Sequence, residues 1–265
     1  MKNNFKKIFI TGGAGFIGSH VSEAFFENFK KSKIIILDKL TYAGNKAFLS
    51  SIINSKRVKF IKGDIANTKK YTKYLKNSDL AINIAAESHV DNSFLSPLNF
   101  TKTNTLGAHA FFLECIKNKV KKILHISSDE VYGEKTKGTS YEDQLVNPTN
   151  PYSASKAAAE ILINSYKYTY KKEIIMVRAN NIYGIRQFPE KLISTSIVNL
   201  IQKKTIPIHG NGQNIRYYLS AIDFANALII LVKKKDRGTY NIGSNYFEKN
   251  INIAKKICEL FKKNP

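Results

Sequence analysis

The chain has 265 residues, of which 43% are hydrophobic and 23% charged, a composition typical of a folded globular protein and not of a disordered one. No apolar run approaches the roughly 18 residues that a membrane span needs, and no signal-peptide pattern is present, so we expect a cytoplasmic protein without a membrane partner. Two cysteines are too few for a disulfide scaffold or a cysteine-rich metal site, and we expect no bound metal.

The charge is strongly basic, with 42 lysines and arginines against 20 acids and a net charge of +22. Nearly all of the excess is lysine, scattered along the chain, and only five residues are arginine. Base readout and bidentate phosphate contacts favour arginine. We therefore interpret the charge as a solvated lysine-rich surface and expect no nucleic-acid partner.

The first predicted strand, residues 7–10, leads into a glycine-rich turn and a helix over 16–30. Gly12 permits the tight turn, Gly15 lets the backbone approach a pyrophosphate, and Gly18 lets the helix pack closely on the strand. A second strand, 34–37, ends at Asp38, about twenty residues after the last glycine. An acid there binds a ribose hydroxyl and repels a 2′-phosphate, so the pattern favours NAD over NADP.

The rest of the first 180 residues continues this alternation. Apolar runs predict four more strands and two helices, namely strands at 58–61, 80–84, 123–126 and 174–178 and helices at about 102–119 and 153–171. Such alternation indicates an α/β fold, a doubly wound parallel sheet of Rossmann type covered on both faces. Ligands bind at the carboxyl ends of such strands. The five residues at or just after these ends should therefore share one crevice: Gly12, Asp38, Asp64, Ala85 and Ser127.

Beyond residue 180 the pattern is less regular. It predicts helices at 190–204 and 220–234 and short strands at 206–209 and 239–242. We therefore expect two domains. Residues 1–180 would form an NAD-binding Rossmann domain that carries the catalytic residues, and residues 181–265 a smaller C-terminal lobe that binds substrate and closes over the crevice.

Two motifs point to acid–base chemistry. Tyr152 and Lys156 stand four residues apart on a predicted helix and so share one face, where an ammonium favours the phenolate and makes the tyrosine a general base. The second motif follows the strand at 123–126, where Ser128 can hold a substrate hydroxyl and Asp129 and Glu130 stand side by side. These carboxylates fit either a helix cap or an acid and a base with separated pKa values, and their position at a strand end favours the second interpretation.

Together these segments resemble the extended short-chain dehydrogenases/reductases, and most closely the nucleotide-sugar 4,6-dehydratases of the dTDP-glucose 4,6-dehydratase type. The resemblance covers essentially the whole chain. It rests on TGGAGFIG at 11–18, LDKLTYAGN at 37–45, GDI at 63–65, AAESHVDNS at 85–93, HISSDEVYG at 125–133, PYSASK at 151–156, NNIYG at 180–184, FPEKLI at 188–193, NIR at 214–216 and TYNIG at 239–243.

The resemblance implies a hydro-lyase that uses NAD to convert dTDP-glucose or UDP-glucose into the 4-keto-6-deoxy sugar. Tyr152 would take the proton of the sugar 4-hydroxyl while C4 gives hydride to NAD, with Lys156 as its activator and a ribose contact. Glu130 would remove the C5 proton and Asp129 would protonate the departing 6-hydroxyl. The hydride would then return to C6, so that the cofactor ends as it began.

The resemblance also implies the residues that line the two binding sites. For NAD, besides the glycines and the Tyr152–Lys156 pair, they are Phe16, Ile17, Asp38, Lys39, Thr41, Asp64, Ile65, Ala85, Ala86, Thr103 and Asn181. For the nucleotide sugar they are Ser88, Ser128, Asn180, Lys191, Leu192, Pro207, Ile208, His209, Arg216 and Asn250. His209 stands where the family usually has a tyrosine beside the base, which leaves the choice between dTDP and UDP open.

Relatives of this type continue for several dozen residues past the position of Pro265, so we expect a chain truncated at its C-terminus, without an arginine-bearing segment that grips the diphosphate. The family also implies a homodimer through the helices near 102–119 and 153–171. Two alternatives stay open: a nucleotide-sugar 4-epimerase or decarboxylase of the same fold, and a truncated NAD-binding protein without catalysis. An epimerase needs the tyrosine and a serine or threonine but no acid pair, so Asp129 and Glu130 argue against it.

Overall fold

The computed structural model describes residues 5–134, 138–170, 172–208, 210–234 and 237–263. Its centre is a seven-stranded sheet in the order β3-β2-β1-β4-β5-β6-β9, with every neighbouring pair parallel. The strands are β1 (Lys7–Thr11), β2 (Lys33–Asp38), β3 (Val58–Lys62), β4 (Leu80–Asn83), β5 (Lys122–Ser128), β6 (Glu173–Ala179) and β9 (Gly238–Ile242). The prediction of a doubly wound Rossmann-type sheet is confirmed.

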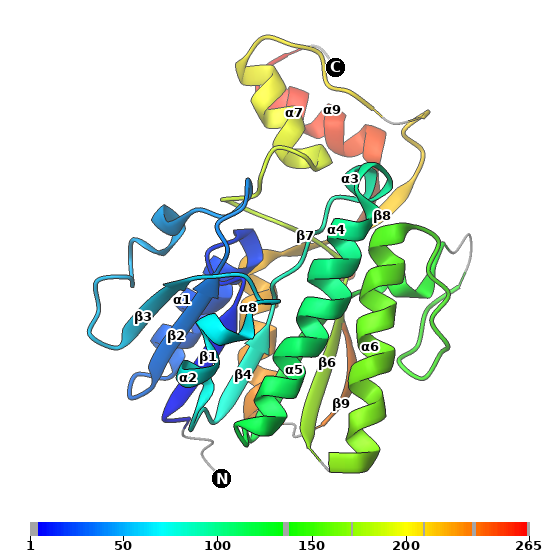
Figure 1. Ribbon diagram of the computed structural model, residues 1–265. Coiled ribbons are helices and arrows are strands. Elements are labelled where there is room, and N and C mark those ends of the chain that lie inside the picture. Colours follow the sequence, from blue (N-terminus) through cyan, green and yellow to red (C-terminus); the bar gives the residue numbers. More distant parts are fainter. Residues whose placement is uncertain (1–4, 135–137, 171, 209, 235–236, 264–265) are drawn as a thin grey trace.

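Helices cover both faces of this sheet (Figure 1). One face packs against α1 (Phe16–Asn28) and α8 (Ala221–Lys234), and the other against α2 (Thr72–Leu75), α5 (Ala108–Lys117) and α6 (Pro151–Tyr170). Successive strand side chains point to opposite faces, so that Ile8 and Ile10 enter the first core and Phe9 the second. Burial on both faces explains the nearly continuous apolar runs of the strands.

Shorter helical segments fill the connections. They are the α-helices α3 (Val90–Leu95) and α4 (Pro97–Phe100), the π-helix η3 (Thr101–Gly107) and the 3₁₀ turns η1 (Lys46–Leu49), η2 (Thr68–Lys70) and η4 (Asp129–Tyr132). The helix expected at 102–119 therefore consists of η3 followed by α5. None of the described helices is long and apolar enough to cross a membrane.

A smaller lobe stands over the carboxyl ends of the sheet, at the top of Figure 1. Its three-stranded sheet has the order β10-β8-β7, with β10 (Phe247–Lys249) antiparallel and β7 (Asn181–Tyr183) parallel to β8 (Ile215–Ser220). Two helices, α7 (Leu192–Ile201) and α9 (Asn250–Leu260), pack beside it. The small core that joins these elements contains Tyr218, Ile253, Ile257, Leu192, Ile193 and Leu200.

Two expectations about the C-terminal part are wrong. Residues 206–208 form no strand, because Pro207 lacks a backbone N–H and the segment runs along the surface; His209 lies outside the described residues. The stretch 181–265 also does not belong wholly to the small lobe. β9 pairs with β6 in the large sheet, and α8 sends Phe224 and Leu228 into the core beside α1, so both elements belong to the larger unit.

Candidate active site

A tight turn joins β1 to α1. Gly12 has a φ of 67°, in the left-handed region that favours glycine, and a Cβ there would lie 2.6 Å from the amide nitrogen of Ala85. A Cβ on Gly18 would lie 1.9 Å from the carbonyl oxygen of Gly12. Both glycines are therefore required by the packing of the turn itself, which brings β1, α1 and the segment after β4 into contact.

Gly15 serves a different purpose. Among the described atoms, a Cβ there would meet only the Gly12 carbonyl oxygen, at 3.4 Å. The space in front of the Gly15 Cα is therefore not filled by the protein. Gly15 also caps α1, and the first amides of a helix lack intrahelical partners and carry partial positive charge. The amides around Phe16 and Ile17 therefore form a cradle for an anion such as a pyrophosphate.

Asp38 ends β2 beside this cradle. Its carboxylate oxygens accept hydrogen bonds from the amides of Ala14 (2.9 Å) and Leu40 (2.7 Å). Burial raises the pKa of Asp38, and these amides counteract part of the rise. The amide of Gly15 acts on the same carboxylate. Since a carboxylate has about four acceptor sites, it is held rigidly and can still accept a ribose hydroxyl.

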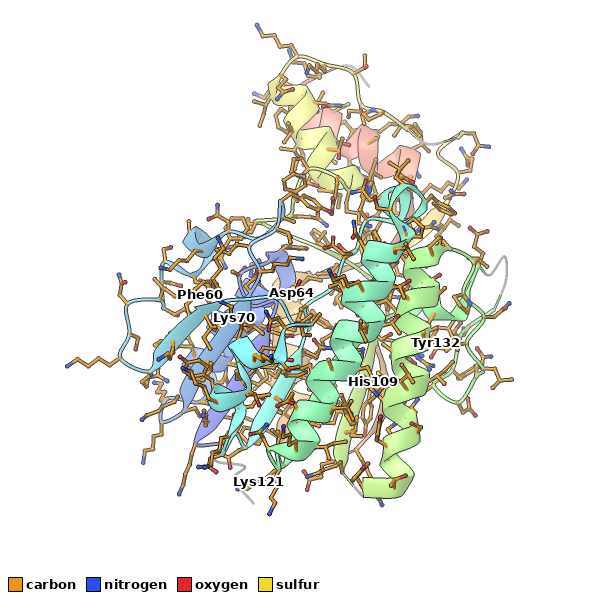
Figure 2. All side chains as sticks on the ribbon, in the orientation of Figure 1. Phe60, Asp64, Lys70, His109, Lys121 and Tyr132 are labelled. Atoms are coloured by element: carbon orange, nitrogen blue, oxygen red, sulfur yellow. The ribbon has the colours of Figure 1, made fainter. Side chains whose placement is uncertain are left out.

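A salt bridge joins the segments that follow β2 and β3. The Lys39 ammonium lies 2.9 Å from a carboxylate oxygen of Asp64, whose other oxygen accepts the amide of Ala66 at 2.8 Å. Burial opposes ionisation of Asp64, but Lys39 and the amide outweigh it and lower its pKa. Figure 2 shows Asp64 in the middle of the molecule, whereas Lys121 lies at the lower end, opposite the small lobe.

The other positions predicted for the cofactor lie on neighbouring segments. The amide of Ala85 donates to Thr11 Oγ1 at 3.3 Å, and Ile65 is buried in the core. The carbonyl oxygen of Thr41 accepts the amide of Gly44, and Ala86 follows Ala85 in the loop after β4. Thr103 lies in η3 and Asn181 begins β7.

The two carboxylates lie in the turn η4, directly after β5. Asp129 Oδ2 accepts the side-chain amide of Asn180 at 2.9 Å. Burial, and then the charge of Glu130, raise the pKa of Asp129 to about 6, against the opposing hydrogen bond of Asn180. Glu130 Oε2 accepts the side-chain amide of Asn150 at 3.2 Å. The two acids therefore have different partners, which is the arrangement that an acid and a base require.

Tyr152 and Lys156 project from the first turns of α6, which begins at Pro151, two residues before the predicted start. Burial and the charges of Glu130 and Asp129 raise the pKa of Tyr152, and a hydrogen bond with the Ser128 side chain lowers it. The Lys156 amine donates to the carbonyl oxygen of Ile126 at 2.6 Å, and burial lowers its pKa to about 8. The tyrosine is thus surrounded by acids and a hydroxyl, and the lysine is bound to β5, so the expected stabilisation of the Tyr152 phenolate by Lys156 is not seen in this arrangement.

Three features of the site escaped the sequence analysis. Asn150 caps α6 by accepting the amide of Ser153 at 2.8 Å, and its own amide reaches Glu130, so one residue ties the helix of Tyr152 to the base candidate. Gly243 leaves space for Asn180, because a Cβ there would lie 1.8 Å from Asn180 Oδ1. The capping pattern of Asn150 was visible in the sequence, but no local signal marks Gly243.

The third feature is a polar row across three strands. Thr11 Oγ1 donates to Asn83 Oδ1 at 2.7 Å, and Asn83 Nδ2 lies 3.0 Å from His125 Nδ1. Burial, and then the charge of Lys156, lower the pKa of His125 well below its usual value, so this ring is neutral. The row connects the strand before the glycine turn with the strand before the carboxylates, and strand pairing alone brings it together.

The positions predicted for substrate fall into separate groups. Lys191 donates to the carbonyl oxygen of Ser88 at 3.2 Å. The positive charge of Arg216 acts to lower the pKa of Asp129, against the effect of burial. Tyr218 donates to Asn250 Oδ1 at 3.2 Å at the start of α9. Leu192 packs in the core of the small lobe, and Pro207 and Ile208 lie in the irregular segment after α7.

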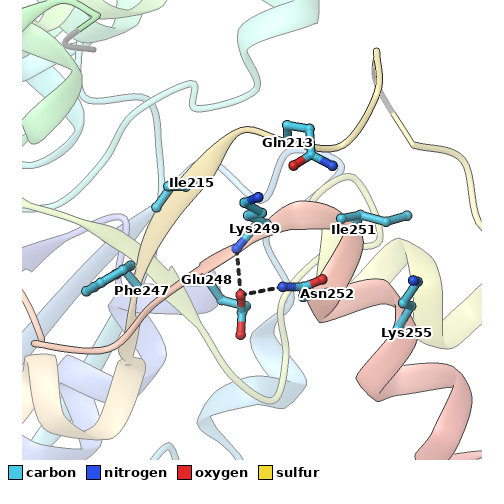
Figure 3. Close-up of a pocket in the computed structure, with 8 residues that line it drawn as sticks. All are labelled: Gln213, Ile215, Phe247, Glu248, Lys249, Ile251, Asn252 and Lys255. Atoms are coloured by element: carbon cyan, nitrogen blue, oxygen red, sulfur yellow. Dashed lines mark hydrogen bonds between the residues drawn. The ribbon is translucent and has the colours of Figure 1, made fainter. Parts of the chain in front are cut away.

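A cavity of about 330 Å³ opens in the small lobe between β8, β10 and α9 (Figure 3). Glu248 lies at its centre, where it accepts the amide of Lys249 and the side chain of Asn252. Its lining contains none of the residues around Asp129 and Tyr152, so the acid–base cluster lies outside this cavity.

Asn180→Ala is expected to raise the pKa of Asp129 above its present value of about 6, because it removes a donor that stabilises the ionised carboxylate. Infrared spectroscopy of the protonated carboxyl group during a pH titration measures this shift. Asn28→Ala, which removes an amide that binds the Ala24 carbonyl on α1, is the matched control and should leave the titration unchanged. An unshifted Asp129 titration in Asn180→Ala would contradict the assignment.

Comparisons with known proteins agree with this geometry. A family model described as GDP-mannose 4,6 dehydratase matches residues 9–263. A dTDP-D-glucose 4,6-dehydratase of Dictyostelium discoideum is 42% identical over 269 residues, covering 96% of this chain and 62% of the relative. A trifunctional UDP-glucose 4,6-dehydratase/UDP-4-keto-6-deoxy-D-glucose 3,5-epimerase/UDP-4-keto-L-rhamnose-reductase of Arabidopsis thaliana is 41% identical, covering 98% of this chain and 40% of the relative.

Among solved structures, the dTDP-glucose 4,6-dehydratase DesIV of Streptomyces venezuelae, with NAD and TYD bound, superposes with a TM-score of 0.94. It is 32% identical, and the match covers 97% of this chain and 82% of DesIV. The chain thus spans about three fifths of the Dictyostelium relative and two fifths of the Arabidopsis one. From the match along nearly its whole length, the chain belongs to the GDP-mannose 4,6-dehydratase family, within the nucleotide-sugar branch of the extended short-chain dehydrogenases/reductases.

Proposed function

We propose that the chain is an NAD-dependent nucleotide-sugar 4,6-dehydratase that converts dTDP-glucose or UDP-glucose into the 4-keto-6-deoxy sugar. The observation that carries the proposal is the acid–base cluster at the end of β5. Asp129 and Glu130 stand near the half-buried Tyr152, and each carboxylate has an amide partner of its own. A tyrosine alone suffices for oxidation of an alcohol, whereas elimination of water needs an additional acid and base.

The glycine turn and Asp38 fit a dinucleotide. Gly15 leaves room on the outer side of the cradle, and Asp38 is held rigidly beside it. Lys39, Asp64 and the segment at Ala85 border the same crevice. NAD, when bound, supplies the redox chemistry that removes hydride from C4 of the sugar and returns it to C6.

The chain's own residues move the protons. Tyr152 accepts the proton of the 4-hydroxyl, and the resulting ketone acidifies the proton on C5. Glu130 removes that proton, and Asp129, whose pKa burial raises to about 6, protonates the departing 6-hydroxyl. Ser128 holds the 4-hydroxyl beside Tyr152. For the nucleotide part we propose the groups on the small lobe and the facing loop: Ser88, Asn180, Lys191, Leu192, Pro207, Ile208, Arg216 and Asn250.

We further propose that the small lobe, without β9 and α8, binds the substrate, and that the enzyme is a homodimer. Apolar side chains exposed on η3, α5 and α6 support the dimer: Leu106, Leu113 and Ile161 are 57%, 42% and 60% accessible. Light scattering measures this assembly. Both cysteines, Cys115 and Cys258, are buried and unpaired, which suits the reducing cytoplasm where we place the enzyme.

The mass of the product tests the reaction. The protein is incubated with NAD and with dTDP-glucose or UDP-glucose, and the nucleotide sugar is analysed by mass spectrometry. Loss of one water from one donor supports the dehydratase and identifies the nucleotide. An unchanged mass with an isomerised sugar would instead support the epimerase alternative, and no reaction despite NAD binding would support a non-catalytic protein.

Gly15→Ala is expected to weaken NAD binding at least about tenfold, because the new methyl group occupies the space that a pyrophosphate needs. It should leave the thermal unfolding temperature nearly unchanged, since its Cβ meets only one protein atom, at 3.4 Å. Gly18→Ala is the contrasting variant, because its Cβ would lie 1.9 Å from the Gly12 oxygen and should destabilise the fold. Calorimetric titration with NAD and thermal unfolding separate the two effects, and unchanged NAD affinity in Gly15→Ala would contradict the cradle.

A further inference from the structure

A buried ion pair that the proposed reaction does not use joins β6 to α6. Arg178 of β6 and Glu160 of α6 are 5% and 1% exposed. Arg178 Nη2 donates to Glu160 Oε2 at 2.7 Å, and Arg178 Nε donates to both carboxylate oxygens at 3.2 and 3.1 Å. Taking two charges out of water costs about as much free energy as their attraction returns, so such a pair adds little net stability. Its contacts point to a role in geometry instead.

The Arg178 guanidinium also contacts the turn that carries the two carboxylates. Its central carbon lies 4.6 Å from the centre of the Tyr132 ring, in a cation–π contact. Tyr132 ends η4, two residues after Glu130, and its hydroxyl donates to Asn241 Oδ1 of β9 at 2.8 Å. One end of the turn is thus fixed between the arginine and β9.

The same arginine holds the loop that leads from η4 to α6. Arg178 Nη1 donates to the carbonyl oxygen of Glu142 at 3.3 Å, and the amide of Asn241 donates to Glu142 Oε1 at 2.9 Å. This loop ends at Asn150, whose side-chain amide donates to Glu130 Oε2 at 3.2 Å. The arginine therefore supports Glu130 in two ways, through the turn that contains it and through the loop that carries its hydrogen-bond partner.

The helix of Tyr152 has anchors of its own. The Lys156 amine donates to the carbonyl oxygen of Ile126 in β5 at 2.6 Å. The side-chain amide of Asn104 in η3 donates to Ser155 Oγ at 2.9 Å. Loss of the arginine leaves both contacts in place, so it should displace the turn with the carboxylates more than the start of α6.

We propose that Arg178, paired with Glu160, is a positioning residue that holds Glu130 in place to remove the C5 proton, an inference that rests on the proposed dehydratase function. Arg178 acts through Tyr132 and through the loop to Asn150, and it takes no part in the proton transfer. A general base must lie within hydrogen-bond reach of its proton, and a displacement of about 1 Å can lower a rate about 100-fold. Glu160 supplies the counter-charge that keeps the guanidinium buried in this orientation.

The double variant Arg178→Met/Glu160→Leu tests the proposal. Apolar side chains of similar size often replace a buried ion pair without loss of stability, so thermal unfolding and NAD binding should stay near those of the wild-type protein. Oxidation at C4 should proceed at nearly the wild-type rate, whereas product formation should fall roughly 10- to 100-fold. Reduced nicotinamide should therefore accumulate on addition of substrate, and its absorbance in stopped flow reports it. A loss of stability alone does not produce this signature.

Arg178→Lys is the second variant. It keeps a positive charge beside Glu160 but lacks the planar fork that binds the carboxylate, the ring and the carbonyl together, so it should accumulate less reduced cofactor than the double variant. Arg57→Met is the matched control. Arg57 also lies over a ring, that of Phe26 at 3.8 Å, and donates to a backbone carbonyl, that of Phe29, but it stands directly before β3, at the other edge of the large sheet from β9. This control should show no accumulation, even if its unfolding temperature falls.

Two results in the double variant would overturn the proposal: product formation at the wild-type rate, or equal losses of C4 oxidation and product formation. Either would leave the ion pair with a structural role only. If the double variant fails to fold, Arg178→Lys decides by the same comparison of the two rates. Absence of keto sugar from the wild-type protein would instead refute the proposed function.

Discussion

Glu130→Gln is expected to oxidise the sugar at C4 but to stop before water leaves. The amide keeps the shape of the side chain and cannot accept the C5 proton, and loss of a general base lowers rates by roughly 10²- to 10⁴-fold. Reduced nicotinamide should therefore accumulate on the enzyme, where its absorbance and fluorescence report it, while product formation falls by that factor.

Glu134→Gln provides the matched control, because it makes the same chemical change at an exposed glutamate of the same loop. We expect it to turn over like the wild-type protein and to show no build-up of reduced cofactor. Asn150→Ala removes the amide that holds Glu130 Oε2 and should give a milder form of the Glu130→Gln result. Full turnover by Glu130→Gln would refute the role of Glu130 as the base.

Tyr152→Phe is expected to abolish the first oxidation. The change removes one oxygen atom from a half-buried ring and with it the group that accepts the 4-hydroxyl proton, so both product formation and reduction of the nicotinamide should fall by roughly 10²- to 10⁴-fold. The two variants thus differ in their signature: Glu130→Gln accumulates reduced cofactor on addition of substrate, and Tyr152→Phe does not.

Tyr170→Phe is the control for this substitution, since Tyr170 lies at the far end of the same helix and is 47% exposed. Calorimetric titration with NAD should show that Tyr152→Phe still binds the cofactor through the glycine turn. If Tyr152→Phe reduces the nicotinamide at a rate near that of the wild-type protein, another group is the base and the cluster needs a new assignment.

Short-range patterns in the sequence were enough to predict the sheet and much of the candidate site. The apolar runs of β1 to β6, the glycines before α1 and the acid at the end of β2 are local signals, each set by the strand period or by a turn. Tyr152 and Lys156 share a helix face for the same reason. These signals located Asp129 and Glu130 at a strand end but left open whether they form a helix cap or an acid–base pair.

The predictions failed where distant segments decide the outcome. A strand was expected at residues 206–209, although Pro207 cannot donate a ladder hydrogen bond. The predicted domain boundary at residue 180 was wrong, because β9 pairs with β6 and α8 packs beside α1 in the larger unit. No local pattern in the sequence says which sheet a late strand joins. No strand was predicted at β8, which carries exposed apolar residues and pairs with β7 and β10.

By itself the sequence determined which residue types were available and at which strand and helix ends they stand. The tertiary structure decided which of them touch. It placed Asn180 on Asp129 and Asn150 on Glu130. These contacts join segments far apart in the chain, and only the packed sheet holds them within hydrogen-bond distance. Burial then raises the pKa of Asp129, because desolvation depends on the whole surrounding fold and not on neighbours in sequence.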